Sequence, residues 1–366
     1  MNVTRTVRLM RAAVAEFELD LGGLTVYTEA ATGGYAVTAV LAALAGAQKV
    51  YALARDNRYA RSAQALAETK ALARAAGADT AIEYVFEKRQ SHLVEADIIT
   101  NTGNVRPLDA QTVSWLRPDA VIPLMYESWE LRHTDLDVDA CRKRGVAVAG
   151  TNERHPKVGL FDYLGLMALK LMLDSRFEVA GSRIALICDN AFAPYLARTL
   201  IDCGAEVRAF GAVEQLTAMS GRLAALRTYA GLEAADLTGC DAILVAASPQ
   251  GEPVVIGTEP SALISGQLLA KSAPGVEVFE FCWGGAVERA AIAGLDIRVW
   301  PEAAPPKGHM SVIPSALGAA PLVRLQAGGL KVGELSSRLR RAGASLQETA
   351  AQMLVTGYGD LIQVLT

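Results

Sequence analysis

The feature that most constrains this chain is a regular alternation of short apolar runs with longer helix-compatible segments. Between residues 24 and 150 the runs are bounded by polar or glycine-containing turns, and the same alternation resumes after residue 155. Such a pattern favours parallel strands joined by helices that cover the sheet. We therefore predict an α/β fold of two Rossmann-like doubly wound lobes with a cleft between them. The expected strands are 24–29, 49–54, 81–86, 97–100, 119–125, 145–150, 181–188, 206–210, 241–247, 276–282 and 295–300.

The length of 366 residues favours two or three domains. We place an N-terminal Rossmann-like lobe at residues 1–155 and a second one at residues 156–305. Helical pieces follow in residues 306–366, of which 345–356 is the clearest, and we expect this segment to pack back on the first lobe.

Charge and cysteine usage narrow the classes of function. The formal net charge is −4, so there is no basic surplus to neutralise phosphates, and we expect no nucleic-acid partner. No apolar run reaches the roughly 18 residues that span a bilayer, so we expect no membrane partner. The five cysteines are far apart and form no CxxC pair, as is usual for reduced thiols. We therefore expect a cytoplasmic protein.

Charged and aromatic side chains gather after two neighbouring predicted strands. Ligands of open parallel sheets bind outside the carboxyl ends of the strands, so these loops form a candidate site. One interpretation is a packed tryptophan among solvated charges. The other is a recognition surface, because Trp, Tyr and Arg anchor partners best. The candidate binding residues are Tyr126, Glu127, Trp129, Glu130, Arg132, Asn152 and Arg154.

The second of these loops also holds the candidates for proton transfer. His155 with Glu153 forms a possible acid–base pair, in which the carboxylate orients the ring. Residues so close in sequence seldom face each other, which counts against this pair. We find no Ser–His–Asp spacing and no metal-ligand cluster elsewhere in the sequence.

A weaker candidate for a cofactor site lies after the first strand. Glu29, Gly33 and Gly34, with Asp56 downstream, are similar to the first motif of S-adenosylmethionine methyltransferases. The alternative is an ordinary strand-to-helix turn that happens to contain two glycines.

Residues 97–320 resemble the D-2-hydroxyacid dehydrogenase family. The resemblance is carried by Asp135-Leu-Asp-Val-Asp-Ala-Cys-Arg-Lys-Arg-Gly145, by Gly294-Leu-Asp296 and by Val312-Ile-Pro314. It implies the two-lobed fold of that family and, in an active member, hydride transfer with a nicotinamide cofactor.

The chain departs from that family where its chemistry lies. The turn after the strand ending at Cys188 reads Asp189-Asn-Ala-Phe-Ala-Pro194 and lacks the glycines that let a pyrophosphate approach a helix N-terminus. Asn190 and Phe192 are expected to stand where the phosphates would lie. Gly211 takes the place of the acidic residue that holds the ribose. Ser315 follows Pro314, where the family has its catalytic histidine. We therefore expect a degenerate member without a cofactor.

Three stretches, Ile122–Arg132, Gly150–Pro156 and Cys188–Pro194, look like a cofactor-free group of such proteins in ribosomal-peptide pathways of the crocagin type. That resemblance implies a peptide or peptide-like ligand in the interdomain cleft and a role in assisting cyclisation. The alternative is an NAD(P)-dependent oxidoreductase with a divergent cofactor site. A homodimer is a further expectation, by analogy with such folds.

Overall fold

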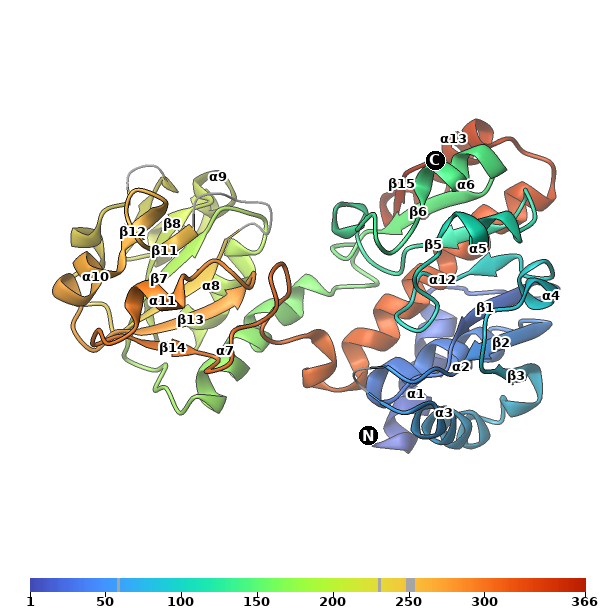
Figure 1. The fold of residues 1–366 in the computed structure, drawn as a ribbon, viewed down its shortest axis with the longest axis horizontal. Coiled ribbons are helices and arrows are strands. Elements are labelled where there is room, and N and C mark those ends of the chain that lie inside the picture. The colour runs from blue at the N-terminus through green and yellow to red at the C-terminus, as the bar shows by residue number, and fades with distance from the viewer. Residues whose placement is uncertain (58–59, 230–231, 248–253) are drawn as a thin grey trace. The chain divides into compact units, whose positions relative to one another are not determined.

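The computed structural model describes residues 1–57, 60–229, 232–247 and 254–366. The chain divides into two compact units (Figure 1). The first unit contains residues 1–160 and 317–366, and the second contains residues 161–316. The domain boundaries drawn from the sequence, at 155/156 and 305/306, stay predictions.

The first unit is built on a sheet with the order β15-β6-β5-β4-β1-β2-β3. Six strands are parallel, and β15 pairs antiparallel with β6 at one edge. The order of the parallel strands is that of doubly wound folds, with the topological switch point between β1 and β4. The strands are β1 (Thr25–Glu29), β2 (Lys49–Leu53), β3 (Ile82–Val85), β4 (Ile98–Ile99), β5 (Val121–Pro123), β6 (Ala147–Thr151) and β15 (Ile362–Val364).

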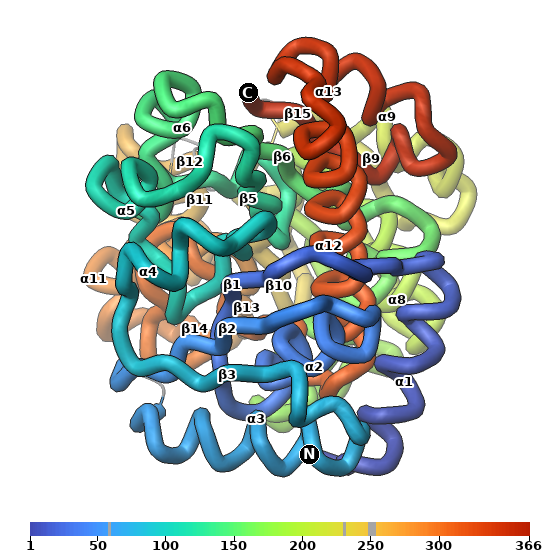
Figure 2. Tube along the Cα trace, turned by 90° about the vertical axis from the view of Figure 1, so that its right-hand side faces the viewer, coloured from blue at the N-terminus to red at the C-terminus, as the bar shows by residue number. Residues whose placement is uncertain are grey.

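Helices cover this sheet, and the longest lies in the segment for which the sequence predicted only helical pieces. Helix α12 (Ala319–Arg341) packs on α1, α2, β5 and β6, and Figure 2 shows it running beside α1 and α2. Added side-chain carbons would lie 2.5 Å from Met125 at Gly329 and 3.0 Å from Ile98 at Gly333, so glycine lets the helix approach the sheet closely. The other helices are α1 (Val3–Glu16), α2 (Val37–Leu44), α3 (Ser62–Ala76), α4 (Gln90–Leu93), α5 (Ala110–Ser114), α6 (Val138–Arg144) and α13 (Leu346–Leu354).

The second unit repeats the same topology. Its main sheet has the order β14-β13-β10-β7-β8-β9, with the switch point between β7 and β10. Its strands are β7 (Arg183–Cys188), β8 (Glu206–Gly211), β9 (Ala225–Arg227), β10 (Ala242–Ala246), β13 (Glu277–Cys282) and β14 (Arg298–Trp300), with a separate pair β11 (Val254–Gly257) and β12 (Ala262–Ser265). Its helices are α7 (Leu164–Asp174), α8 (Ala193–Asp202), α9 (Val213–Leu216), α10 (Gly266–Ser272) and α11 (Arg289–Ile292).

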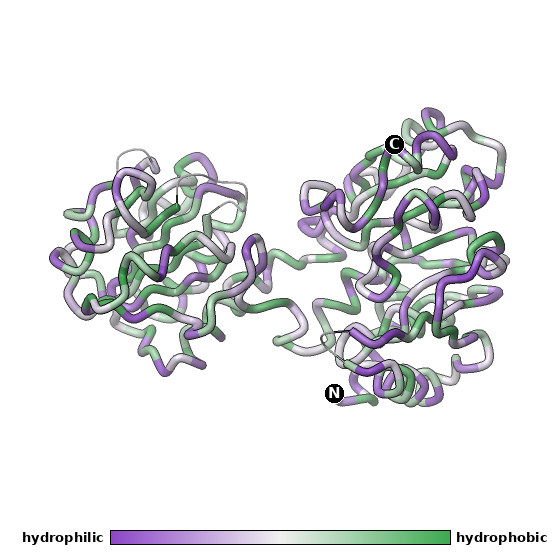
Figure 3. The backbone as a smooth tube through the Cα atoms, viewed as in Figure 1, coloured by the Kyte–Doolittle hydropathy of each residue, from purple (hydrophilic) through white to green (hydrophobic). Residues whose placement is uncertain are grey.

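Both units have an apolar core formed by strands and the inner faces of helices. Figure 3 shows hydrophobic residues concentrated along the strands and polar residues in the connections. The predicted α/β class with two Rossmann-like lobes is confirmed. Among the helices that the structure describes, none combines the length and apolarity needed to cross a membrane.

Candidate functional site

The two loops singled out in the sequence lie side by side at the carboxyl ends of β5 and β6. The strands pair in parallel, so their following segments leave the sheet at the same edge. A backbone hydrogen bond from Thr151 N to Tyr126 O (2.9 Å) continues the pairing into the loops. We call residues 126–130 the aromatic loop and residues 152–157 the histidine loop.

Glu127 cross-links the two loops. Its side chain is buried, and its Oε2 accepts a hydrogen bond from Trp129 Nε1 at 2.5 Å. Its Oε1 accepts from the backbone N–H of Glu153 at 3.2 Å and lies 3.6 Å from Arg154 Nε. A carboxylate with this many donors holds the backbone of one loop and the tryptophan of the other in fixed positions.

Three carboxyl groups lie close enough here to interact electrostatically: those of Glu127, Glu130 and Glu153, which we call the carboxylate trio. Burial, with Glu127 nearby, raises the pKa of Glu130 to about 7. Burial and the two neighbouring carboxylates raise the pKa of Glu153 well above its usual range. Like charges in a poorly hydrated place disfavour further ionisation, so Glu130 and Glu153 retain protons near neutral pH.

The other side chains in and near the aromatic loop lie in different environments. Trp129 lies in the short 3₁₀ turn η3 (Ser128–Glu130) and is 40% exposed. Tyr126 is half-buried, and its hydroxyl accepts a hydrogen bond from Asn101 Nδ2 at 2.6 Å. The Arg106 guanidinium lies 4.9 Å from the Tyr126 ring centre. Arg132 is exposed, and its charge, like that of Arg106, counteracts the rise in the pKa of Glu130.

The histidine loop is held by residues near the C-terminal end. Asn152 donates from its backbone N–H to Leu361 O (2.8 Å) and from Nδ2 to Asp360 O (2.7 Å), and its Oδ1 accepts from the N–H of Arg154 (3.0 Å). Asn152 therefore has a structural role here, and its predicted contact with a ligand stays a prediction.

His155 and Glu153 occupy separate surroundings. The buried His155 ring places Nε2 3.4 Å from Asp360 Oδ1 and accepts from the N–H of Lys157 at Nδ1 (3.2 Å). Nε2 therefore carries the proton of the neutral ring, and Asp360 takes the orienting position that we expected of Glu153. Burial lowers the pKa of His155, which favours this neutral form. The catalytic roles of both residues stay predictions.

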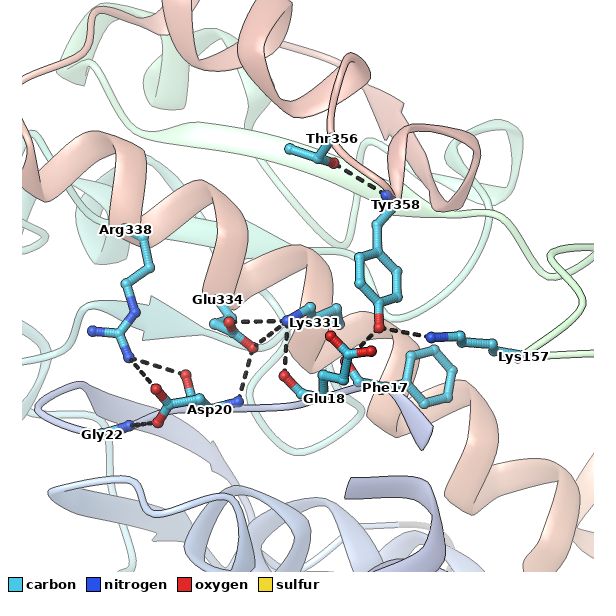
Figure 4. Close-up of polar contacts among 10 residues, drawn as sticks. All are labelled: Phe17, Glu18, Asp20, Gly22, Lys157, Lys331, Glu334, Arg338, Thr356 and Tyr358. Atoms are coloured by element: carbon cyan, nitrogen blue, oxygen red, sulfur yellow. Dashed lines mark hydrogen bonds and ion pairs between the residues drawn. The ribbon is translucent and has the colours of Figure 1, made fainter. Parts of the chain in front are cut away.

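The support beneath the histidine loop is a polar cluster on α12 (Figure 4). Tyr358 donates from its hydroxyl to Phe17 O (2.7 Å) and accepts from Lys157 Nζ (2.8 Å). Lys331 lies 5.0 Å from the Tyr358 ring centre and forms a buried ion pair with Glu334 at 3.0 Å. The cluster joins the segment that follows α1, helix α12 and the histidine loop.

A second polar group lies at the switch point of this unit. Glu29, at the end of β1, is buried and accepts from the N–H of Asn104 at 2.8 Å. Burial raises its pKa to about 7. Thr100 donates to Thr28 at 2.8 Å, and the buried Asn101 Oδ1 has no hydrogen-bond partner among the residues described. We did not single out this cluster in the sequence, although small polar residues directly after the predicted strand 97–100 were a usable signal.

The two glycines after β1 have roles in the fold. The N–H of Gly33 donates to Glu68 Oε2 at 2.8 Å, so a carboxylate of this chain occupies that donor. A side-chain carbon at Gly34 would lie 2.5 Å from Leu322, so glycine there lets α12 pack. These contacts favour the ordinary strand-to-helix turn over a methyltransferase-like cofactor site.

In the second unit, Asn190 closes the turn after β7. Its Oδ1 accepts from the N–H of Phe192 (3.0 Å), a donor that would otherwise face a phosphate, and its Nδ2 donates to Ala246 O across the switch point (3.0 Å). The expectation for Phe192 was wrong: its side chain is buried and packs edge-on against Phe161, with ring centres 5.0 Å apart. The turn leads into α8, whose apolar face is buried, so the Phe192 ring packs in the core with that face.

Within the described ranges, no group of three or more His, Cys, Asp or Glu side chains is placed to hold a metal ion.

Comparison with known proteins supports the fold. No protein-family model and no curated protein sequence matches this chain. A dipicolinate synthase component from Bacillus halodurans has a TM-score of 0.55 at 12% identity, covering 84% of this chain and 96% of that chain. Its counterpart from Bacillus subtilis has a TM-score of 0.55 at 12% identity, covering 89% and 100%. A putative NAD-binding, D-isomer specific 2-hydroxyacid dehydrogenase from a Polaromonas strain has a TM-score of 0.44 at 16% identity, covering 81% and 96%.

This chain shares its fold with the two dipicolinate synthase components. At such low identity the likeness is one of fold, because one fold hosts many chemistries.

Proposed function

We propose that this chain is a cofactor-free, dehydrogenase-like protein that binds a peptide or peptide-like substrate in ribosomal-peptide natural-product biosynthesis and assists its cyclisation. The observation that carries the proposal is the meeting of the carboxylate trio with Trp129 at the carboxyl ends of β5 and β6. An exposed tryptophan beside buried acids offers both a large contact area and a charge-selective contact.

The chemistry of the trio favours a ligand with a protonated amine. Burial, together with repulsion between the carboxylates, raises the pKa values of Glu130 and Glu153. A cation nearby would offset both effects, so both groups would ionise more readily on binding. An ammonium group also binds favourably over the face of a tryptophan. A peptide supplies such a group at its N-terminus or on a lysine side chain.

The turn at Asn190 supports the cofactor-free part of the proposal. Its side chain already accepts from the Phe192 N–H, so a pyrophosphate would have to displace a hydrogen bond of the chain itself. Asp189, at the start of the turn, is exposed, and its negative charge would repel a phosphate bound beside it. The alternative, an NAD(P)-dependent oxidoreductase, is supported by the fold alone.

Calorimetry with a matched panel tests the proposal. The panel is a short peptide with a free N-terminus, the same peptide N-acetylated, NAD⁺ and NADP⁺. We expect the free amine to bind at least about tenfold more tightly than the acetylated form, because an interaction with a charged group is lost. At about 100 times the dissociation constant, a true ligand adds roughly 2.7 kcal/mol to the free energy of unfolding. Binding of NAD⁺ without the peptide would overturn the proposal.

Amine binding is expected to release protons from the trio. Affinity for a lysine-bearing, N-acetylated peptide should rise as the pH increases from 6 to 8, since Glu130 with a pKa of about 7 ionises in this range while the lysine stays charged. Titrations in two buffers of different ionisation enthalpy measure the released protons. A pH-independent affinity without proton release would contradict a role of the trio in binding.

Trp129→Ala is expected to weaken peptide binding by about 2 kcal/mol, roughly 30-fold, if the indole is an anchor. Leu268→Ala, at an apolar side chain of similar exposure in the second unit, is the matched control and should leave the affinity unchanged. If both variants bind the peptide as tightly as the unmodified protein does, Trp129 does not contribute to binding.

A further inference from the structure

The segment from Tyr358 to Gln363 contacts both loops of the candidate site. Strand β15 pairs with β6 in antiparallel register, with Ile362 opposite Thr151 and Gln363 opposite Gly150. The histidine loop is attached to this segment through Asn152, His155 and Lys157. The aromatic loop is attached to this segment through the side chain of Gln363.

Gln363 Oε1 accepts a hydrogen bond from the backbone N–H of Ser128 at 2.7 Å. Ser128 begins the 3₁₀ turn η3, and the first N–H groups of a helical turn have no partner within it. The contact is closely packed, because a side-chain carbon at Gly150 would lie 2.8 Å from Ser128 N and 3.2 Å from Gln363 Oε1. Gln363 thus fixes the start of the turn that carries Trp129 and Glu130.

We propose that Gln363 is a positioning residue for ligand recognition: its side-chain carbonyl holds the aromatic loop against the histidine loop and so sets the spacing of the carboxylate trio. This inference rests on the proposed function and adds to it a residue outside both loops. Strand β15 pairs with β6 through its backbone, whereas Gln363 contacts the aromatic loop through its side chain. A change of that side chain should therefore act on the site with little effect on the rest of the fold.

The test compares two substitutions of similar size. Gln363→Met removes the acceptor, whereas Gln363→Glu keeps an oxygen at the same place. We expect the methionine variant to bind the free-amine peptide at least about tenfold more weakly, as for a lost hydrogen bond together with a displaced loop, and the glutamate variant to bind within about threefold of the unmodified protein. Gln352→Met, at an exposed glutamine on α13, controls for the added methionine.

A second readout does not depend on the peptide. Carboxyl NMR titration of Glu130 should show its pKa fall from about 7 towards the usual value in Gln363→Met, since a released loop is hydrated. In Gln363→Glu the pKa should not fall, because the loop stays in place and the added negative charge can only raise it. If Gln363→Met does not fold, Gln363→Ala takes its place. An unchanged Glu130 titration with unchanged affinity overturns the inference. Failure of the unmodified protein to bind any peptide overturns the proposed function, and the titration then decides the positioning role alone.

Discussion

Lys331→Met is expected to lower the free energy of unfolding of the first unit by about 3–5 kcal/mol, the usual effect of removing one partner from a buried ion pair. Lys331 and Glu334 are both almost fully buried, and their charged atoms lie 3.0 Å apart. The methionine fits the space but leaves the Glu334 carboxylate without its cation. It also removes the donor to Glu18 O. Peptide-resolved hydrogen exchange of α12 measures the free energy of this unit separately.

The matched control is the exposed helical pair of Lys170 and Asp174 on α7, at 2.8 Å. Lys170→Met should change stability by less than about 0.5 kcal/mol, because solvent screens an exposed pair. A loss below about 1 kcal/mol for Lys331→Met would mean that the Glu334 site admits water or takes up a proton at little cost.

Glu29→Gln is expected to stabilise the first unit at pH 8 and to leave its stability unchanged at pH 4. The folded-state pKa of Glu29 is about 7, against 4.5 for an unperturbed glutamate. A raised pKa means that the stability contributed by the protonated form is fully present below pH 4.5 and is lost as the pH rises through 7. Glutamine remains neutral and can still accept from the Asn104 N–H, so the gain at pH 8 should be about 3 kcal/mol.

The pH profile of this gain distinguishes titration from packing. Urea unfolding at pH 4, 6 and 8 should show the difference between Glu29→Gln and the unmodified protein growing between pH 4.5 and 7. Glu87→Gln, at an exposed carboxylate of the same unit, should run parallel to the unmodified protein at each pH. A gain of equal size at all three pH values would assign the effect to packing and not to the buried charge.

Much of the fold could be predicted because its local signals agree. Gly77 and Gly145 end their helices in the left-handed conformation that glycine favours, and each precedes a strand that the apolar runs had marked. That the aromatic and histidine loops lie side by side could be predicted from the rule that parallel strands end at the same edge of the sheet.

The parts that were missed depend on contacts distant in sequence. Helix α12 contains Gly328 and Gly329, which lower helix propensity, and only its packing against the sheet explains them. The partner of His155 is Asp360, and no local pattern links those two positions. The predicted orientation of Phe192 was wrong because the sequence of a turn does not determine which of its side chains packs in the core.

Strand β15 also bears on how copies of this protein behave together. The outer edge of β6 would otherwise display a row of free N–H and C=O groups, which invites strands of other chains to pair. By running antiparallel along that edge, residues 362–364 occupy it with the chain's own backbone. The edge that remains is that of β15 itself, which is three residues long. The strand that holds the aromatic and histidine loops therefore also leaves the sheet with a short edge that offers few groups to another chain.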